Sequence, residues 1–364
     1  MNRFNIIYKV RVRVLLMAAI LLVGCTADDD TAVQQEDTLQ LAAYTRSYTD
    51  ITTRADGYNR YKPEGVTSIG IYMTPADEGD PVLEYFSFNG FKWQSNIGVK
   101  ARQYYIYGFM PGDVINKSNC SITPLSGDYA NGAVLTLDGL KPISKTDVCV
   151  VVGVGGTTEP STDNNAQNNA QLGSFLYDGT GKGKGQHYVN LLMDHIYSCL
   201  QFKMKVAEQY AQVRTIKLKR MELQTAKISA TKATITLTAN TTNPLSIAWD
   251  TPTASTGMSI TIFESEDGKE PELPSVADAA PLLLSGNVIP GCTDDLSLKC
   301  TYDVYDRKGN LIRKDCVSTN KLPSSLDIKY LKAGERQPIE LTVAPTYLGV
   351  LSDPDLNNPD ITFN

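Results

Sequence analysis

Apolar and polar residues alternate with a period of two along much of the second half of the chain. Phe202, Met204 and Val206 alternate with lysines, and the same pattern recurs at 216–218, 235–237 and 339–343. Such alternation predicts strands with one face on a core and one face in water, as in antiparallel sheets. Many strands of this kind separated by turn residues are typical of β-sandwiches. The pattern therefore predicts an all-β fold.

The first half of the chain also favours strands. Short apolar stretches with β-branched residues occupy 66–73, 104–109, 134–137 and 148–152. Helical periodicity is scarce, and its best candidate is the segment 189–200. That segment could equally begin a strand, because it leads directly into the alternation that starts at Phe202.

One long stretch divides the chain. Residues 155–186 are rich in Gly, Asn, Thr and Lys and disfavour regular structure, which predicts a long loop or linker. A chain of 364 residues holds about two domains, at about 100–200 residues each. We therefore predict an N-terminal β-sandwich over 37–185 and a C-terminal β-sandwich over 186–364.

The N-terminus predicts export. Residues 1–24 carry four basic residues and no acidic one, and 14–23 are apolar, as in a secretory signal peptide. The apolar run is too short to span a bilayer. The residues Leu22-Val23-Gly24-Cys25 resemble the lipobox of bacterial lipoproteins. This predicts a signal peptide over 1–24, acylation (palmitate included) at Cys25, and an acylated tether over 25–36. The alternative is an ordinary secretory signal with an incidental cysteine.

An acidic cluster at 28–30 follows the predicted acylation site. It resembles the export signal that sends lipoproteins to the outer face of some Gram-negative bacteria, and a solvated linker is the alternative. The first interpretation predicts a lipid-anchored protein of the outer membrane, exposed at the cell surface or in a fimbrium.

Cysteines beyond Cys25 can be oxidised in an exported protein. The segment 306–310 is typical of a hairpin turn. If Asp306 faces Asn310, Tyr305 faces Leu311, Asp303 faces Arg313, and Cys300 lies opposite Cys316. We predict that the two cysteines are cross-strand neighbours and leave the bond between them open.

The composition argues against several classes of function. A net charge of −6 lacks the basic footprint of a nucleic-acid binder. The chain has two histidines: we expect His195 to be packed with a nitrogen on a backbone partner, and His187 to be solvated. The glycines at 179–185 lack the spacing of a phosphate-binding loop, and 353–360 lacks the Gly and Glu of a calcium loop. We therefore expect no enzyme, cofactor or metal.

Aromatic residues leave a binding role open. Tyrosine is abundant, with 19 residues, and Trp93 is a candidate for a platform on which a glycan stacks. The alternative is that these rings fill a core.

Further motifs follow one another in order along the chain. They are Thr52-Thr53-Arg54-Ala55-Asp56 after the lipobox, Phe91-Lys92-Trp93 before Tyr104–Pro111, the run His195–Phe202, and Pro345–Leu348 before Leu351–Asp355. In this order they resemble the fimbrillin or Mfa-like family, the lipoprotein pilus subunits of Gram-negative anaerobes. The resemblance covers essentially the mature chain.

The resemblance implies an architecture and an assembly mechanism. The architecture is two transthyretin-like antiparallel β-sandwich domains in tandem. In the mechanism, a trypsin-like protease cuts the lipidated precursor after an arginine and removes the first strand, whose place a strand from another pilus subunit takes. Here the removable strand would be Thr38–Tyr44, with Arg54 as the first candidate cut site and Arg46 as the second. The C-terminal residues 361–364 are a candidate donor strand.

An alternative interpretation leaves the chain uncut. Both arginines would then be solvated linker residues that are never cut. The protein would be an anchor subunit or a surface-anchored adhesin that binds a host glycan or protein.

Overall fold

The computed structural model describes residues 37–50, 57–61, 68–157, 169–226, 231–250, 257–278, 280–291, 296–323, 326, 328–344 and 360–363. The predicted signal peptide, Cys25 and Arg54 lie outside these residues. By its contacts, Asp37–Asn364 forms one compact unit. Among the described residues, no helix is both long enough and apolar enough to cross a membrane.

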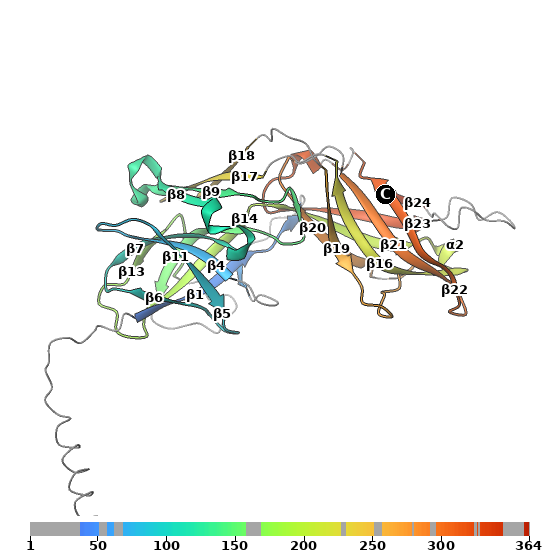
Figure 1. The fold of residues 1–364 in the computed structure, drawn as a ribbon, viewed down its shortest axis with the longest axis horizontal. Coiled ribbons are helices and arrows are strands. Elements are labelled where there is room, and N and C mark those ends of the chain that lie inside the picture. Colours follow the sequence, from blue (N-terminus) through green and yellow to red (C-terminus); the bar gives the residue numbers. More distant parts are fainter. Residues whose placement is uncertain are drawn as a thin grey trace, which may run out of the picture. The chain divides into compact units, whose positions relative to one another are not determined.

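Strands make up most of the described chain, which confirms the predicted all-β class (Figure 1). We name the four sheets A to D. Sheet A contains β1 (Asp37–Arg46), β3 (Tyr58–Arg60), β4 (Ser68–Pro75), β5 (Val82–Phe88), β6 (Trp93–Val99), β7 (Gln103–Met110), β11 (Cys149–Thr157), β12 (Gln171–Leu172), β13 (Leu176–Asp178) and β14 (Tyr188–His195).

The other three sheets are smaller. Sheet B contains β2 (Thr49–Asp50), β10 (Ile143–Ser144), β15 (Ser198–Val206), β20 (Leu282–Val288), β23 (Glu335–Ala344) and β24 (Asp360–Phe363). Sheet C contains β8 (Cys120–Pro124), β9 (Gly132–Asp138), β17 (Lys232–Thr238) and β18 (Leu245–Trp249). Sheet D contains β16 (Arg214–Thr225), β19 (Met258–Glu264), β21 (Leu296–Asp306) and β22 (Leu311–Lys321).

Helices are short. The described helices are α2 (Glu208–Ala211) and the 3-10 turns η1 (Gly112–Val114), η2 (Lys117–Asn119), η3 (Leu125–Gly127), η4 (Tyr129–Asn131) and η6 (Ile328–Tyr330).

The pairings of sheet A close into a ring. The strand order runs β11-β14-β1-β6-β5-β4-β7, and β7 also pairs with β11. One buried cluster takes side chains from all seven of these strands, among them Leu41, Ile71, Trp93, Ile106 and Val151. These side chains fill the interior of the ring, and we call them the ring core.

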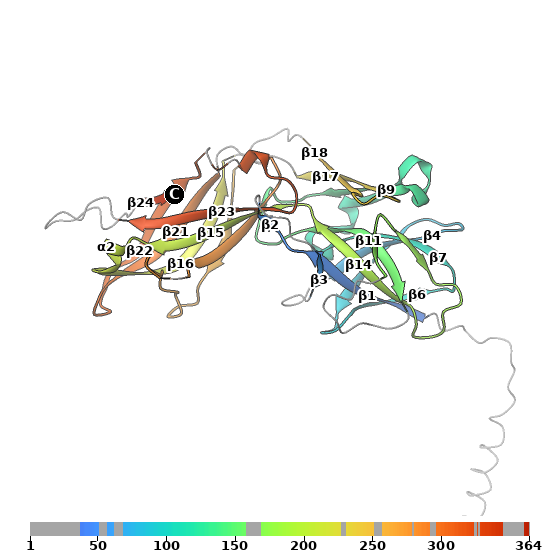
Figure 2. The same ribbon diagram turned by 180° about the vertical axis from the view of Figure 1, so that it is seen from behind.

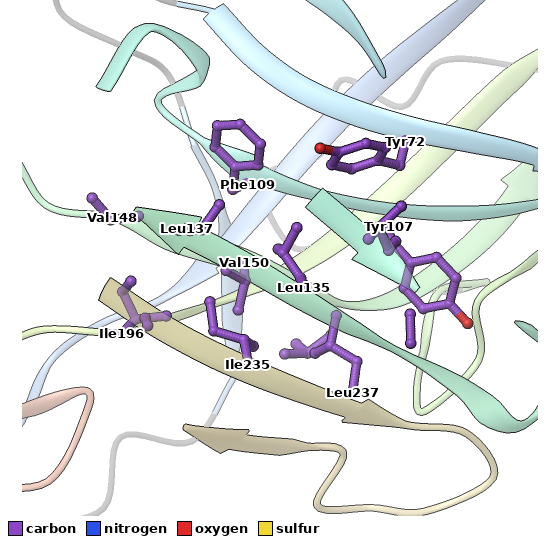
Figure 3. Close-up of a cluster of buried hydrophobic side chains, with 14 of the residues drawn as sticks. Tyr72, Tyr107, Phe109, Leu135, Leu137, Val148, Val150, Ile196, Ile235 and Leu237 are labelled. Atoms are coloured by element: carbon purple, nitrogen blue, oxygen red, sulfur yellow. The ribbon is translucent and has the colours of Figure 1, made fainter. Parts of the chain in front are cut away.

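Sheet C packs against the outside of this ring. Leu135 and Leu137 from β9 and Ile235 and Leu237 from β17 meet residues of sheet A such as Tyr107 (Figure 3). This second cluster, the outer core, is the interior of a sandwich between sheets A and C.

Sheets B and D form a second sandwich, seen from behind in Figure 2. Its core is built from the inward residues of the predicted alternating strands. Phe202, Met204 and Val206 of β15 are each 2% exposed or less, and so are Ile339 and Leu341 of β23. The alternation is therefore confirmed, and the helix candidate 189–200 belongs to the strands β14 and β15.

The predicted boundary at 185/186 does not separate the sheets. The strand β14 pairs with β1 and β11, and β17 pairs with β9, so strands on both sides of residue 185 share sheets A and C. The predicted number of domains stays a prediction. Within the predicted linker, the short strands β12 and β13 pair with β11 and β7.

The register observed in the hairpin between β21 and β22 differs from the one predicted for the two cysteines. The turn forms at 306–310, and Tyr305 pairs with Leu311 as predicted. Two bulges then shift the register, one of them beside Asp315, which has a φ of 56°. As a result Cys316 lies opposite Tyr302, Cys300 lies opposite Ser318, and Arg313 faces Val304. The direct opposition of the cysteines is wrong, and both are free thiols.

Candidate functional site

The strand β1 lies inside the ring of sheet A and not at an edge. It pairs in parallel with β14 over 40–45 and antiparallel with β6 over 37–41. Beyond β6, its last residues pair with β3. Its backbone groups are therefore used on both sides.

Both faces of β1 are buried. Leu39, Leu41 and Ala43 enter the ring core, whereas Ala42 and Tyr44 enter the outer core. All five side chains are 2% exposed or less. Burying a large apolar side chain contributes about 1.5–3 kcal/mol. Because its two faces enter different clusters, β1 ties the two cores together.

The end of β1 is held by a buried tyrosine. The Arg46 guanidinium donates to the Tyr58 hydroxyl at 2.9 Å, and that hydroxyl donates to the Asp194 carboxylate at 2.7 Å. The Arg46 Nε also lies 3.6 Å from Asp194. Burial and the neighbouring Asp194 raise the pKa of Tyr58, which keeps the hydroxyl protonated.

A second network surrounds His195, the last residue of β14. Its Nδ1 lies 2.5 Å from the Asp147 carboxylate, and its Nε2 lies 2.5 Å from the Arg46 carbonyl oxygen. Because both partners are acceptors, both ring nitrogens donate, so the imidazole is positively charged. The Cys149 thiol completes this cluster, 3.3 Å from Nδ1 and 3.4 Å from Asp147 Oδ2.

The pKa values agree with this charge state. Burial opposes a charge on His195, but Asp147 and the Arg46 carbonyl outweigh it, so the pKa of His195 is raised. Burial likewise opposes the charge of Asp147, but His195 outweighs it and lowers the pKa of that carboxyl. The thiol of Cys149 has a raised pKa, first through burial and then through Asp147.

Tyr48 extends the network to sheet B. Its ring stacks on His195, with centroids 4.0 Å apart, and its hydroxyl donates to Asp147 Oδ1 at 2.6 Å. The same hydroxyl lies 3.1 Å from Asn287 Oδ1 on β20. Next along the chain, β2 pairs in parallel with β23. The segment that leaves β1 is therefore attached to both sandwiches.

The predicted site residues that the structure describes lie in different surroundings. The predicted removable strand Thr38–Tyr44 lies within β1. Arg46 is half-buried and engaged, and is not a solvated linker residue. The packed His195 is confirmed, with its backbone partner. His187 is buried against Tyr177, so its predicted solvation is wrong. Trp93 is 0% exposed and cannot present a glycan platform.

Sequence reasoning missed the cluster around His195. Asp147 and Cys149 are two residues apart at the start of a strand, which places both side chains on one side. That spacing is the only local signal, because His195 lies 46 residues beyond Cys149 and meets it through strand pairing.

Solved structures similar to this chain include fimbrial proteins and proteins provisionally assigned to cell adhesion from Bacteroides. A protein provisionally assigned to cell adhesion from Bacteroides fragilis is 12% identical, with 90% of this chain and 97% of that chain covered and a TM-score of 0.44. A fimbrial protein from Bacteroides vulgatus is 13% identical, with coverages of 90% and 99% and a TM-score of 0.39. These identities and TM-scores indicate only a distant similarity.

A fimbrial protein from Bacteroides ovatus is also similar, at 11% identity and a TM-score of 0.33, with 86% of this chain and 52% of that chain covered. No family model and no curated protein matches the chain.

Proposed function

We propose that the chain is the precursor of a fimbrial subunit, anchored to the outer membrane through Cys25, that assembles by strand exchange after proteolysis. The observation that supports this proposal is the position of β1. It precedes every other described strand, yet it lies between β14 and β6 with both faces buried. A single cut after β1 would therefore free a strand whose loss opens the ring.

The opened ring would attract a replacement strand. Losing β1 would leave backbone groups of β14 and β6 unpaired and would expose both cores, and unpaired strand edges are templates for pairing. A strand of another subunit could supply the main-chain hydrogen bonds, with alternate side chains in the vacated pockets. Head-to-tail filling does not close on itself and generates a fibre. The proposed role is structural and not enzymatic.

The contacts of Arg46 favour Arg54 as the cut site. A protease of the trypsin class must bind an arginine side chain and an extended backbone around it. At Arg46, the guanidinium is engaged by Tyr58 and Asp194, and the carbonyl by His195. We therefore place the cut after Arg54, which lies outside the described residues, and keep Arg46 as the second candidate.

The test is limited trypsin digestion of the chain without its signal peptide and with Cys25 replaced by Ser. We expect one early cut, identified by N-terminal sequencing, followed by growth of the particles in light scattering. Arg54→Gln should block both, whereas Arg46→Gln should leave both unchanged. Cutting without growth, or growth that neither Arg54→Gln nor Arg46→Gln prevents, would contradict the proposal.

A synthetic peptide sharpens this test. A peptide with the sequence of 37–46, added before the cut chain assembles, should occupy the vacated place and stop growth. The matched peptide with Leu41→Asp should not, because Leu41 is fully buried in the ring core. Equal inhibition by both peptides would show that growth does not depend on this place.

One observation favours a second function, that of a monomeric surface-anchored adhesin. A cavity of about 480 Å³ beside the end of β1 is lined by Trp249, Ile247, Asn243, Arg46 and Asp194, among others. An aromatic ring beside amide and charged groups suits a sugar or a peptide. Binding on a glycan array that Trp249→Ala abolishes, by a chain that trypsin leaves intact, would favour this function.

A further inference from the structure

Three different metal-binding atoms meet beside the end of β1. Cys149 Sγ, His195 Nδ1 and Asp147 Oδ2 all lie within 4.8 Å of one another. We propose that Asp147, Cys149 and His195 form a binding site for Zn²⁺. This site does not depend on the proposed function, because all three ligands lie outside the strand that the proposed cut would remove.

The spacing of the atoms suits a tetrahedral ion. Zn²⁺ binds sulfur at about 2.3 Å and nitrogen or oxygen at about 2.0–2.2 Å, so neighbouring ligand atoms lie about 3.3–3.6 Å apart. The two distances from Cys149 Sγ, 3.3 and 3.4 Å, already match this spacing. The third distance, 2.5 Å between His195 Nδ1 and Asp147 Oδ2, is a hydrogen bond that must widen by about 0.8 Å.

Groups around the three ligands also suit a metal. A ligating histidine usually donates its other ring N–H to a carbonyl or carboxylate, and ligating carboxylates are themselves hydrogen-bonded. Here His195 Nε2 donates to the Arg46 carbonyl, and Asp147 Oδ1 accepts from the Tyr48 hydroxyl. The stacked Tyr48 ring fixes the plane of the imidazole. Both hydrogen bonds can persist when the ion binds.

The backbone that carries the ligands is part of the ring. Cys149 on β11 and His195 on β14 are register partners, directly opposite each other. Asp147 precedes Cys149 by two residues, and its side chain is 27% exposed, which gives an ion a way in from solvent. Sites on paired strands hold their ligands more rigidly than sites on loops.

Binding would exchange protons for the ion. Zn²⁺ would replace the Cys149 S–H proton and the His195 Nδ1 proton, and both protons would leave to solvent, while Asp147 contributes a lone pair. A water molecule would fill the fourth position. The ion would keep the Nε2 donor on the Arg46 carbonyl, and would therefore link β11 and β14 to the end of β1.

The test uses Co²⁺ as a spectroscopic probe, with the reduced chain lacking its signal peptide and Cys25. We expect thiolate-to-metal absorption in the near ultraviolet and intense d–d bands typical of tetrahedral Co²⁺, displaced by equimolar Zn²⁺. Cys149→Ala and His195→Asn should abolish these bands. The matched variants Cys300→Ala, at another buried thiol, and His187→Asn, at the other histidine, should retain them.

A second measurement keeps the proposal testable if the variants fail to fold. X-ray absorption of the zinc-loaded wild-type chain should show one sulfur and three nitrogen or oxygen ligands at tetrahedral distances. Ligation by nitrogen and oxygen alone would overturn the proposal. So would Co²⁺ bands that survive Cys149→Ala, bands that Cys300→Ala removes, or no bands at all.

Discussion

The strands β1 and β22 are similar in length but differ in their surroundings. β1 spans Asp37–Arg46 inside the closed ring, and both its faces are buried. β22 spans Leu311–Lys321 at the end of sheet D, pairs there with β21 on one side, and is exposed at most positions. The loss of β22 would move an edge to β21, whereas the loss of β1 would open a groove between two strands. A strand's place, and not its length, decides what its removal does.

A charge introduced into each strand gives the largest expected contrast. Leu41→Asp in β1 should lower the free energy of unfolding by about 3–5 kcal/mol, because the carboxylate would lie unpaired in the ring core. Val317→Asp in β22 should cost at most about 0.5 kcal/mol, because Val317 is 45% exposed. Urea unfolding followed by tryptophan fluorescence measures both. Similar losses would show that β1 is no more embedded than β22.

Two glycines compare the ring with the sandwich of sheets B and D. A Cβ at Gly108 would lie 2.4 Å from the Gly70 carbonyl oxygen, which belongs to the backbone of the paired strand β4. At Gly286 the nearest atom is an Ile262 methyl at 3.1 Å, which can shift. Gly108→Ala should therefore cost about 2–3 kcal/mol, and Gly286→Ala less than about 1 kcal/mol. If thermal unfolding shows equal losses of stability for the two variants, the ring is no more closely packed at Gly108 than the second sandwich is at Gly286.

Removal of the Tyr48 hydroxyl tests how strongly the segment that follows β1 is attached to its surroundings. Tyr48→Phe removes the hydrogen bond to Asp147 and the contact with Asn287, and keeps the ring stacked on His195. We expect a loss of about 1–2 kcal/mol, because the acceptor is a partly buried carboxylate. Tyr305→Phe, on the β21 side of its hairpin, is the matched control and should be near neutral. Faster amide hydrogen exchange over 46–50 would locate the effect.

The smallest expected effect is at Arg46. Arg46→Gln should cost about 0.2–1 kcal/mol, because the side chain is 37% exposed and its ion pair with Asp194 is screened by water. Its control is Arg313→Gln on β22, with an expected change near zero. A loss above about 2 kcal/mol would mean that the contact with Tyr58 matters far more than surface ion pairs usually do.

The sequence predicts the strands well where one face meets water. In β15, Phe202, Met204 and Val206 are buried and the two lysines between them are partly exposed, so the period-two pattern is visible. In β23, Ile339 and Leu341 are likewise buried and Glu340 between them is exposed. β1 has no such clean pattern, because Ala42 and Ala43 are adjacent and both buried on opposite faces. The sequence predicts that this segment is a strand, but it does not predict the strand's central position in the sheet. The partners Tyr188–Met193 lie far along the chain.

Register and long-range clusters escape local reasoning for a related reason. The turn at 306–310 sets the pairing of Tyr305 with Leu311, but the left-handed Asp315, whose amide donates to Asp303 at 2.7 Å, inserts a bulge further on. Each extra residue slips the strand by one, which separates Cys300 from Cys316. In the same way, the residues next to Asp147 and Cys149 in the sequence do not predict a contact with His195, which is brought to them by the pairing of β11 with β14.

The parallel pairing of β1 with β14 has a consequence for direction. Parallel and antiparallel ladders place their hydrogen bonds differently, so a strand that restores the ladder along Tyr188–Met193 must run the same way as β1. Every subunit would then receive its strand from the same end. A fibre built in this way has two unlike ends, one with an open groove and one with an unused strand, and it lengthens by adding molecules in a single orientation.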